Sequence, residues 1–250
     1  MIVLLVQLLV VLGLLLWADR WLHQHLQGVM LLLTGDDDIA LWLYAIVLLP
    51  GVALHELSHA AVARVVGVKI GRVNIFPQRS SKRVQLGFVL VQETDFFRAS
   101  LIGGAPLIAG SIAVVAIGYL VFGTPEILAA LSAGAWWDGL RNLAQMLQAP
   151  DVWLWVYLVF AVGNTMLPSR SDIHAWPFTV FAAVAIAAMI VVLGGTSFLL
   201  IGASQFLTIA VRWLVLLGAS VLLADLPIFA TMYLLQKLLE RVRDVRIEYR

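Results

Sequence analysis

The chain has 250 residues, of which 62% are hydrophobic and only 12% are charged. A soluble globular domain is usually about half apolar and about a quarter charged, so this composition predicts an integral membrane protein rather than a soluble domain. The formal net charge of +1 offers no basic surface for nucleic acid, so we expect no such partner. Because the chain has no cysteine, disulfides and thiolate metal sites are excluded, and any metal must be held by His, Asp, Glu or Asn.

Six stretches are read as transmembrane helices, which need about 20 mostly apolar residues to cross about 30 Å of hydrocarbon. They are Ile2–Ala18, Ile39–Val66, Ala99–Phe122, Val152–Leu167, Pro177–Ile201 and Phe206–Leu235. The first stretch lacks a basic leader and a small-residue cleavage site, so we expect it to be retained as a span. The sequence therefore predicts an all-α polytopic membrane protein, with residues 1–250 forming a single domain. Its core is 39–175, and 177–250 supply additional C-terminal helices.

Two segments between the spans have a different pattern. Residues Val68–Val91 contain two glycines and Pro77 among β-forming residues, which predicts a small membrane-associated β-hairpin between the second and third spans. Residues Pro125–Leu147 have apolar side chains near helical spacing. They predict an amphipathic helix at the membrane surface, with a substrate-gating element as the alternative.

The basic residues predict an orientation, because cytoplasmic loops carry an excess of Lys and Arg. Gly35–Asp38 and Thr124–Pro150 hold few basic residues. The basic side chains that flank the other span ends are Arg64, Lys69, Arg72, Arg79, Lys82, Arg83, Arg98, Arg170, Lys237, Arg241, Arg243, Arg246 and Arg250. We therefore expect a multi-pass protein of a bacterial-type plasma membrane, with both termini and the basic C-terminal tail in the cytoplasm.

One motif carries chemistry, the run His55-Glu-Leu-Ser-His59 in the second predicted span. Two histidines four residues apart in a helix project from one face and can share one metal ion. Glu56 lies beside the metal rather than on it, where a carboxylate can activate zinc-bound water. Packing between helices is the alternative, but ionisable groups are costly within a span and are usually functional. The motif therefore predicts a zinc hydrolase.

A catalytic zinc site needs a third protein ligand. Asp172 follows the fourth span, with His174 close to it, and Asp225 lies inside the sixth. For Asp225 we favour a structural hydrogen bond between helices, with cavity lining or metal binding as alternatives. His23 and His25 lie beyond the first span, where solvated or interfacial side chains are expected.

The segment Asn164-Thr-Met-Leu-Pro-Ser-Arg-Ser-Asp172, taken with the motif from His55 to His59, resembles the site-2 protease family of intramembrane metalloproteases. That family pairs a membrane His-Glu-x-x-His with a later Asn…Pro…Asp segment. The resemblance implies that Zn²⁺ is held by His55, His59 and Asp172. It also implies that Asn164 binds substrate or polarises the oxyanion, and that the hairpin presents substrate in extended form.

The resemblance covers roughly Leu54–Asp172, about half the chain, and includes the run Ser100–Pro106, which looks like the small-residue start of the family's next core helix. No stretch could supply the family's regulatory PDZ module. We therefore expect a minimal intramembrane zinc metalloprotease. It would hydrolyse peptide bonds in or near transmembrane segments of proteins within the lipid bilayer, with Glu56 as general base. The alternative is a non-proteolytic membrane metal-binding protein, a transporter or a scaffold.

Overall fold

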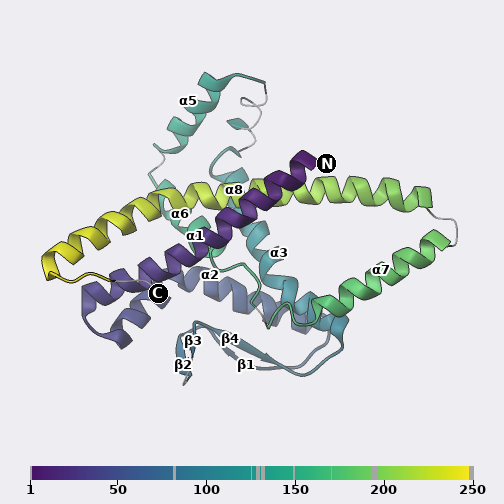
Figure 1. Ribbon diagram of the computed structural model, residues 1–250, viewed down its shortest axis with the longest axis horizontal. Helices are drawn as coiled ribbons and strands as arrows, with labels where there is room; N and C mark the ends of the chain where they lie inside the picture. Colours follow the sequence, from purple (N-terminus) through teal and green to yellow (C-terminus); the bar gives the residue numbers. More distant parts are fainter. Residues whose placement is uncertain are drawn as a thin grey trace.

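A computed structural model describes residues 2–80, 83–124, 126–127, 130, 133–148, 150–169, 171–192 and 196–247. This part of the chain is mostly helical, with four short strands (Figure 1). The helices are α1 (Ile2–Thr34), α2 (Asp37–Val65), α3 (Phe96–Leu120), α5 (Trp136–Met146), α6 (Val152–Gly163), α7 (Trp176–Val192) and α8 (Thr196–Arg243). The strands are β1 (Ile70–Asn74), β2 (Gln78–Ser80), β3 (Arg83–Gln85) and β4 (Phe88–Val91).

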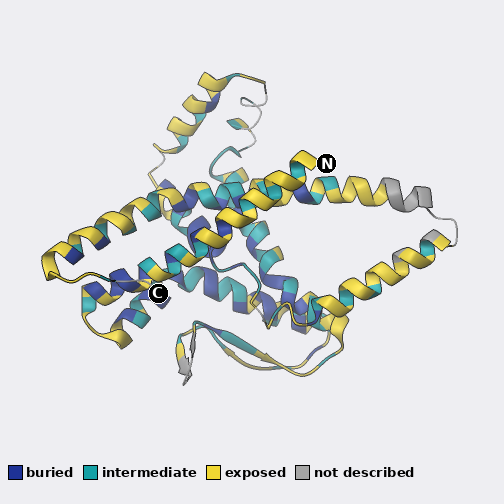
Figure 2. Cartoon of the chain, in the orientation of Figure 1, coloured by how far each residue is buried: buried dark blue, intermediate teal, exposed yellow. Residues whose placement is uncertain are grey.

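Four of these helices, α1, α2, α3 and α8, are long and apolar enough to cross a membrane. Helices α6 and α7 are also apolar but have only 12 and 17 residues. Each of the six predicted stretches thus overlaps a helix, and four of these helices have the length and composition of a membrane span. Exposed residues cover the outer faces of α1, α7 and α8 (Figure 2), and many of these residues are large and apolar. Such a surface is rare on a soluble monomer, so the fold is compatible with an integral membrane protein.

The last two helices meet earlier in the chain than the sequence predicts. Helix α7 ends at Val192, and α8 begins at Thr196 instead of Phe206 and runs for 48 residues. Between them lie residues 193–195, outside the described residues; two of the three are glycines, the poorest helix formers after proline. The stretch 202–205, where the prediction placed the break, holds a single glycine and no proline.

Helices α1 and α8 pack along each other and run in the same direction. Three contacts in order along both helices show this, and they join Val11 to Gly218, Trp21 to Phe229 and Leu33 to Arg243. The Trp21 and Phe229 ring centroids are 4.8 Å apart. The Arg243 guanidinium donates to the Leu33 carbonyl at 2.9 Å. The predicted topology has these two helices crossing in opposite directions, so the parallel pair disagrees with it.

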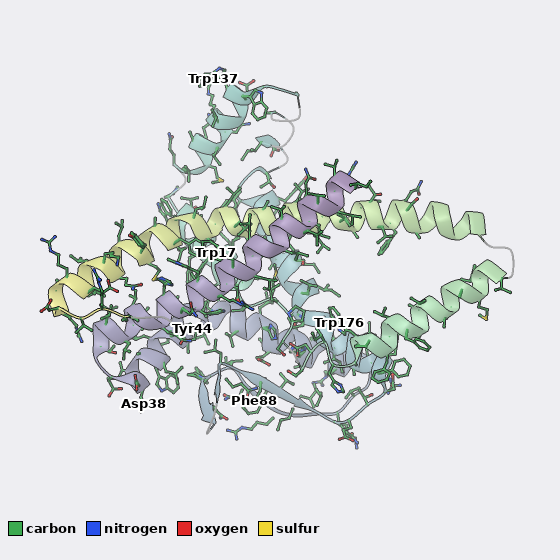
Figure 3. All side chains as sticks on the ribbon, viewed as in Figure 1. Trp17, Asp38, Tyr44, Phe88, Trp137 and Trp176 are labelled. Carbon is green, nitrogen blue, oxygen red and sulfur yellow. The ribbon has the colours of Figure 1, made fainter. Side chains whose placement is uncertain are left out.

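A contact at the C-terminal end of α1 and α8 accounts for their parallel packing. Arg243 reaches the last turn of α1 and lies beside Gly35, in the acidic turn Gly35–Asp38 that begins α2. Figure 3 labels Asp38 in this turn. A cation at a helix C-terminus is favourable. The basic tail and the acidic turn, predicted on opposite sides, therefore lie at one end of the molecule. Lys82, Arg170 and Arg250 of the predicted basic set lie outside the described residues.

The predicted hairpin is confirmed as a strand-forming segment. Strands β1 and β4 pair antiparallel, with Ile70 opposite Val91 and Asn74 opposite Phe88. Strands β2 and β3 pair antiparallel further out along the same hairpin. Part of the predicted amphipathic segment forms α5, which stands away from the other helices (Figures 1 and 3) and leaves Trp137 84% exposed. Pro125, the start of that prediction, lies outside the described residues.

The helices that position the site approach each other at glycines. A Cβ at Gly51 of α2 would collide with the Ala161 carbonyl of α6, so only glycine allows this separation. Gly103 of α3 lies equally close to the backbone carbonyl of Asp172. The buried core beside these contacts is made mainly by α1, α2 and α6, with Leu48 and Phe160 among its fully buried side chains.

Candidate metal centre

Helix α2 presents His55 and His59 on one face, as their spacing predicts, and both rings are oriented by backbone carbonyls. His55 Nδ1–H donates to the carbonyl of Thr165 at 2.6 Å, just beyond the end of α6. His59 Nδ1–H donates to the carbonyl of Ile102 in α3 at 2.8 Å. A carbonyl can only accept, so in each neutral ring Nδ1 carries the proton and Nε2 keeps its lone pair. The two Nε2 atoms lie 3.2 Å apart.

The third member of the group is Asp172, in the loop between α6 and α7. Its Oδ1 lies 3.3 Å from His59 Nε2, and its Oδ2 lies 3.7 Å from His55 Nε2. The backbone N–H of Ser169 donates to Oδ2 at 2.6 Å and fixes the carboxylate. Burial disfavours its charged form, but the neighbouring His55 ring and the hydrogen bonds from Ser169 outweigh this and hold the pKa of the Asp172 carboxyl below its usual value. It is therefore an anion that faces two imidazole nitrogens.

This donor set fits a divalent metal ion. Two lone-pair nitrogens and a carboxylate oxygen point at one another, with the ligand atoms all within 4.8 Å of each other. Three acceptors so close together repel unless a cation or a proton lies between them. Ligands about 2.0–2.2 Å from a tetrahedral zinc ion lie about 3.3–3.6 Å apart. The two Nε2 atoms, 3.2 Å apart, are close to this separation, while the carboxylate faces the two rings with different oxygens. Hydrogen bonds from Nδ1 to carbonyls are also the usual support of metal-binding histidines.

The group formed by His55, His59 and Asp172 is the single one of its kind in the described part of the chain. The structure thus brings together the three predicted ligands, although Asp172 lies more than a hundred residues after the two histidines. His174, the alternative third ligand, is exposed and does not belong to the group. The identity of the metal stays a prediction.

Glu56 lies next to the group without being part of it, which suits a base better than a ligand. Its side chain is buried, with 8% exposure, and the charges of His55 and Asp172 act on it. The hairpin covers it: a Cβ at Gly87, which joins β3 to β4, would come within 2.7 Å of Glu56 Cγ and 2.9 Å of Oε1. The backbone at Gly87 therefore fixes where the carboxylate can lie.

Asn164 faces away from the metal group, toward α8. Its side-chain amide donates to the Phe160 carbonyl at 2.9 Å and to Asp225 Oδ1 at 2.8 Å, so both amide protons are used. The predicted oxyanion role would need one of these protons to be released, and it stays a prediction. Asp225 makes the interhelical hydrogen bond favoured from the sequence.

Several residues that shape the centre were not identified from the sequence. Thr165 and Ile102 contribute main-chain carbonyls, for which a side-chain pattern gives no signal. Gly103 lies in the small-residue run Ser100–Pro106, for which the sequence predicts only the start of a helix.

His23, expected to be solvated or interfacial, lies half-buried between α1 and α2. A hydrogen bond of 2.7 Å joins its Nδ1 to Tyr44 Oη, and its Nε2 lies 3.0 Å from Asp19 Oδ1.

Comparisons with known proteins identify no relative: no family model matches the chain, and no curated protein or solved structure matches it significantly. Function is therefore inferred from the geometry of the site.

Proposed function

We propose that the protein is an intramembrane zinc metalloprotease similar to the site-2 protease family. The observation that carries this proposal is the convergence of His55, His59 and Asp172, with both histidines tethered at Nδ1 and both Nε2 atoms facing the carboxylate. The two histidines belong to a helix long and apolar enough to span a membrane. A metal-ligand group on such a helix is costly unless it serves a function.

The residues of the chain have separate roles in this proposal. His55, His59 and Asp172 would hold the zinc ion, which when bound supplies Lewis acidity and makes water acidic enough to attack a peptide carbonyl at neutral pH. Glu56 acts as general base, takes a proton from the attacking water and passes it to the leaving amine. Its burial beneath Gly87 excludes bulk water from the carboxylate and fixes its direction.

The substrate would be a transmembrane segment of another protein within the lipid bilayer. A helical segment hides its peptide bonds in hydrogen bonds, so it must unwind before it is cut. Strands β1 and β4 form a two-stranded ladder, and each strand has a second edge that can pair with an extended chain. Because β4 directly follows Gly87, a chain added there would lie close to Glu56.

A membrane metal transporter is the second candidate, and one observation favours it. Polar groups lie between helices away from the metal group, in the contacts Asp19–His23–Tyr44 and Asn164–Asp225. A transport path needs polar groups in several spans. Asp225, however, is fully buried and bonded to Asn164, so proteolysis remains the function that the site supports best.

The test compares purified wild-type protein with the Glu56→Gln variant. Both should bind about one zinc ion per chain, because Glu56 is not a ligand, and only the wild type should cleave a membrane substrate. Membrane proteomes of cells carrying each form should differ by helical fragments that accumulate with the variant. Full cleavage by Glu56→Gln would refute the mechanism. Zinc uptake into proteoliposomes without cleavage would favour the transporter.

A further inference from the structure

Asp225 of α8 is the most deeply buried charged residue of the described chain, with 0% exposure. Its Oδ1 accepts from Asn164 at 2.8 Å, while its Oδ2 has no hydrogen-bond partner among the described residues. A buried carboxyl oxygen without a partner destabilises the folded protein. Such a group is usually retained for a reason other than stability.

The partner of Asp225 stands at the turn that ends α6. Asn164 caps this helix, and its amide is held on both sides, by the Phe160 carbonyl within α6 and by Asp225 across the helix interface. The next residue, Thr165, bonds through its hydroxyl to the Ala161 carbonyl at 2.9 Å. The turn is therefore fixed by one hydrogen bond from α8 and several from α6.

The same turn orients a metal ligand. The carbonyl of Thr165 accepts from His55 Nδ1 at 2.6 Å, so the plane and tautomer of this imidazole depend on where the turn lies. Asn164 and Thr165 are neighbours in this turn, so a displacement of the backbone at Asn164 also displaces the Thr165 carbonyl. A continuous connection thus runs from Asp225 through Asn164 and Thr165 to His55.

We propose that Asp225 is a positioning residue of the metal centre, which fixes the turn after α6 and through it the His55 imidazole. This inference rests on the proposed metal site but not on proteolysis. It assigns a role to α8, a helix that contributes no ligand. It also explains why Asp225 keeps a buried carboxyl with an unpartnered oxygen: the other oxygen holds the Asn164 amide in place.

Packing by α8 is the competing explanation, and the structure offers a matched control for it. Val221 lies one turn before Asp225 on α8 and is also fully buried. Its side chain packs on Gly163, the residue before Asn164. Val221→Ala therefore loosens the same α6–α8 contact without touching the hydrogen bond, whereas Asp225→Leu removes the hydrogen bond and keeps an apolar side chain in contact.

The experiment measures Co²⁺ binding by the full chain in detergent, through competition with a chromophoric chelator and through the Co²⁺ absorption spectrum. Loss of a supporting hydrogen bond at a metal site typically lowers affinity about 10–100-fold, and Asp225→Leu should reach the lower part of this range and shift the absorption bands. Asp225→Asn should recover most of the affinity, because its amide oxygen can accept the same bond. Val221→Ala should change affinity and spectrum little.

A double variant makes the test sharper. If Asp225 acts through Asn164, then Asn164→Leu combined with Asp225→Leu should lower Co²⁺ affinity no more than either single change, because both remove one interaction. Wild-type affinity in Asp225→Leu, an equal loss in Val221→Ala, or additive losses in the double variant would each overturn the proposal. Thermal unfolding of each variant shows whether it is folded. If Asp225→Leu is not, Asn164→Leu alone removes the same hydrogen bond, and wild-type affinity in that variant would overturn the proposal.

These outcomes are separable from failure of the proposed function. A wild-type protein that binds Co²⁺ but cleaves nothing would refute proteolysis and leave the role of Asp225 standing. A wild-type protein that binds no divalent metal would overturn both.

Discussion

The close contact between Gly87 of the hairpin and Glu56 predicts how far Gly87→Ala lowers the rate of cleavage. The new methyl group would lie 2.7 Å from Glu56 Cγ, 2.9 Å from Oε1 and 3.0 Å from the Asn74 carbonyl. Non-bonded carbon atoms prefer about 3.5–4.0 Å, so the Glu56 side chain or the hairpin must move by roughly 1 Å. Misplacement of a catalytic group by about 1 Å can lower the rate about 100-fold. The three atoms nearest to the new methyl group belong to Glu56 and Asn74, and none belongs to a proposed ligand.

We therefore expect Gly87→Ala to retain about one zinc per chain and to lower kcat by about 10–100-fold, with a smaller change in KM. The assay is cleavage of a labelled membrane substrate in detergent micelles, with zinc content measured on the same preparation. Gly71→Ala is the matched control in β1, because a methyl group there meets only Leu90, at 3.3 Å or more. Full activity in Gly87→Ala, or an equal loss in Gly71→Ala, would show that the hairpin does not position Glu56.

Three further predictions concern the ligands and the helix pairing. Gly103→Ala would push on the Asp172 carbonyl and should lower zinc affinity about 10–100-fold in a chelator competition assay. Chelation should abolish cleavage, and added zinc should restore it, as measured by the same substrate assay. In this cysteine-free chain, the pair Val11→Cys and Gly218→Cys should form a disulfide on oxidation, seen as a shift in gel mobility, because the two positions touch in the parallel arrangement.

Each of these predictions has a built-in comparison. Gly104→Ala meets only Trp176, at 3.9 Å, and should bind zinc normally, so an equal defect there would point to general damage of α3. Cleavage that survives complete removal of metal would rule out a metalloprotease. A cysteine at Gly202, which has no neighbour within 4 Å, should not cross-link to position 11.

The parts of the site that the sequence predicts are those encoded locally. A spacing of four within one helix places His55 and His59 on one face whatever surrounds them, and Glu56 follows from its place beside the first histidine. Asp172 lies more than a hundred residues away, so no local pattern links it to the motif, and only the resemblance to a family suggested it. Its arrival at the two histidines depends on the close approach of α6 to α2, which Gly51 permits, and of the Asp172 loop to α3, which Gly103 permits.

The parts that the sequence does not predict depend on contacts between distant segments. The direction of the Asn164 amide is set by a hydrogen bond to Asp225, 61 residues later in the chain, which no local pattern indicates. Helix α8 continues through Gly202, where the sequence predicted a break, because a helix tolerates a single glycine. The strand segment was predictable because its glycines and proline exclude a long helix.

The pairing of α1 with α8 also limits what charge counting can decide about orientation. With 33 and 48 residues, both helices are longer than one perpendicular crossing of about 30 Å requires, so they must tilt or project from the bilayer. Their parallel course puts the basic tail at the same end as the start of α2, while the hairpin's basic residues lie at the other end of α2. The two basic groups therefore cannot both satisfy the positive-inside rule. The hairpin end carries the larger group, so the rule predicts this end in the cytoplasm, together with the proposed metal centre; the orientation stays a prediction.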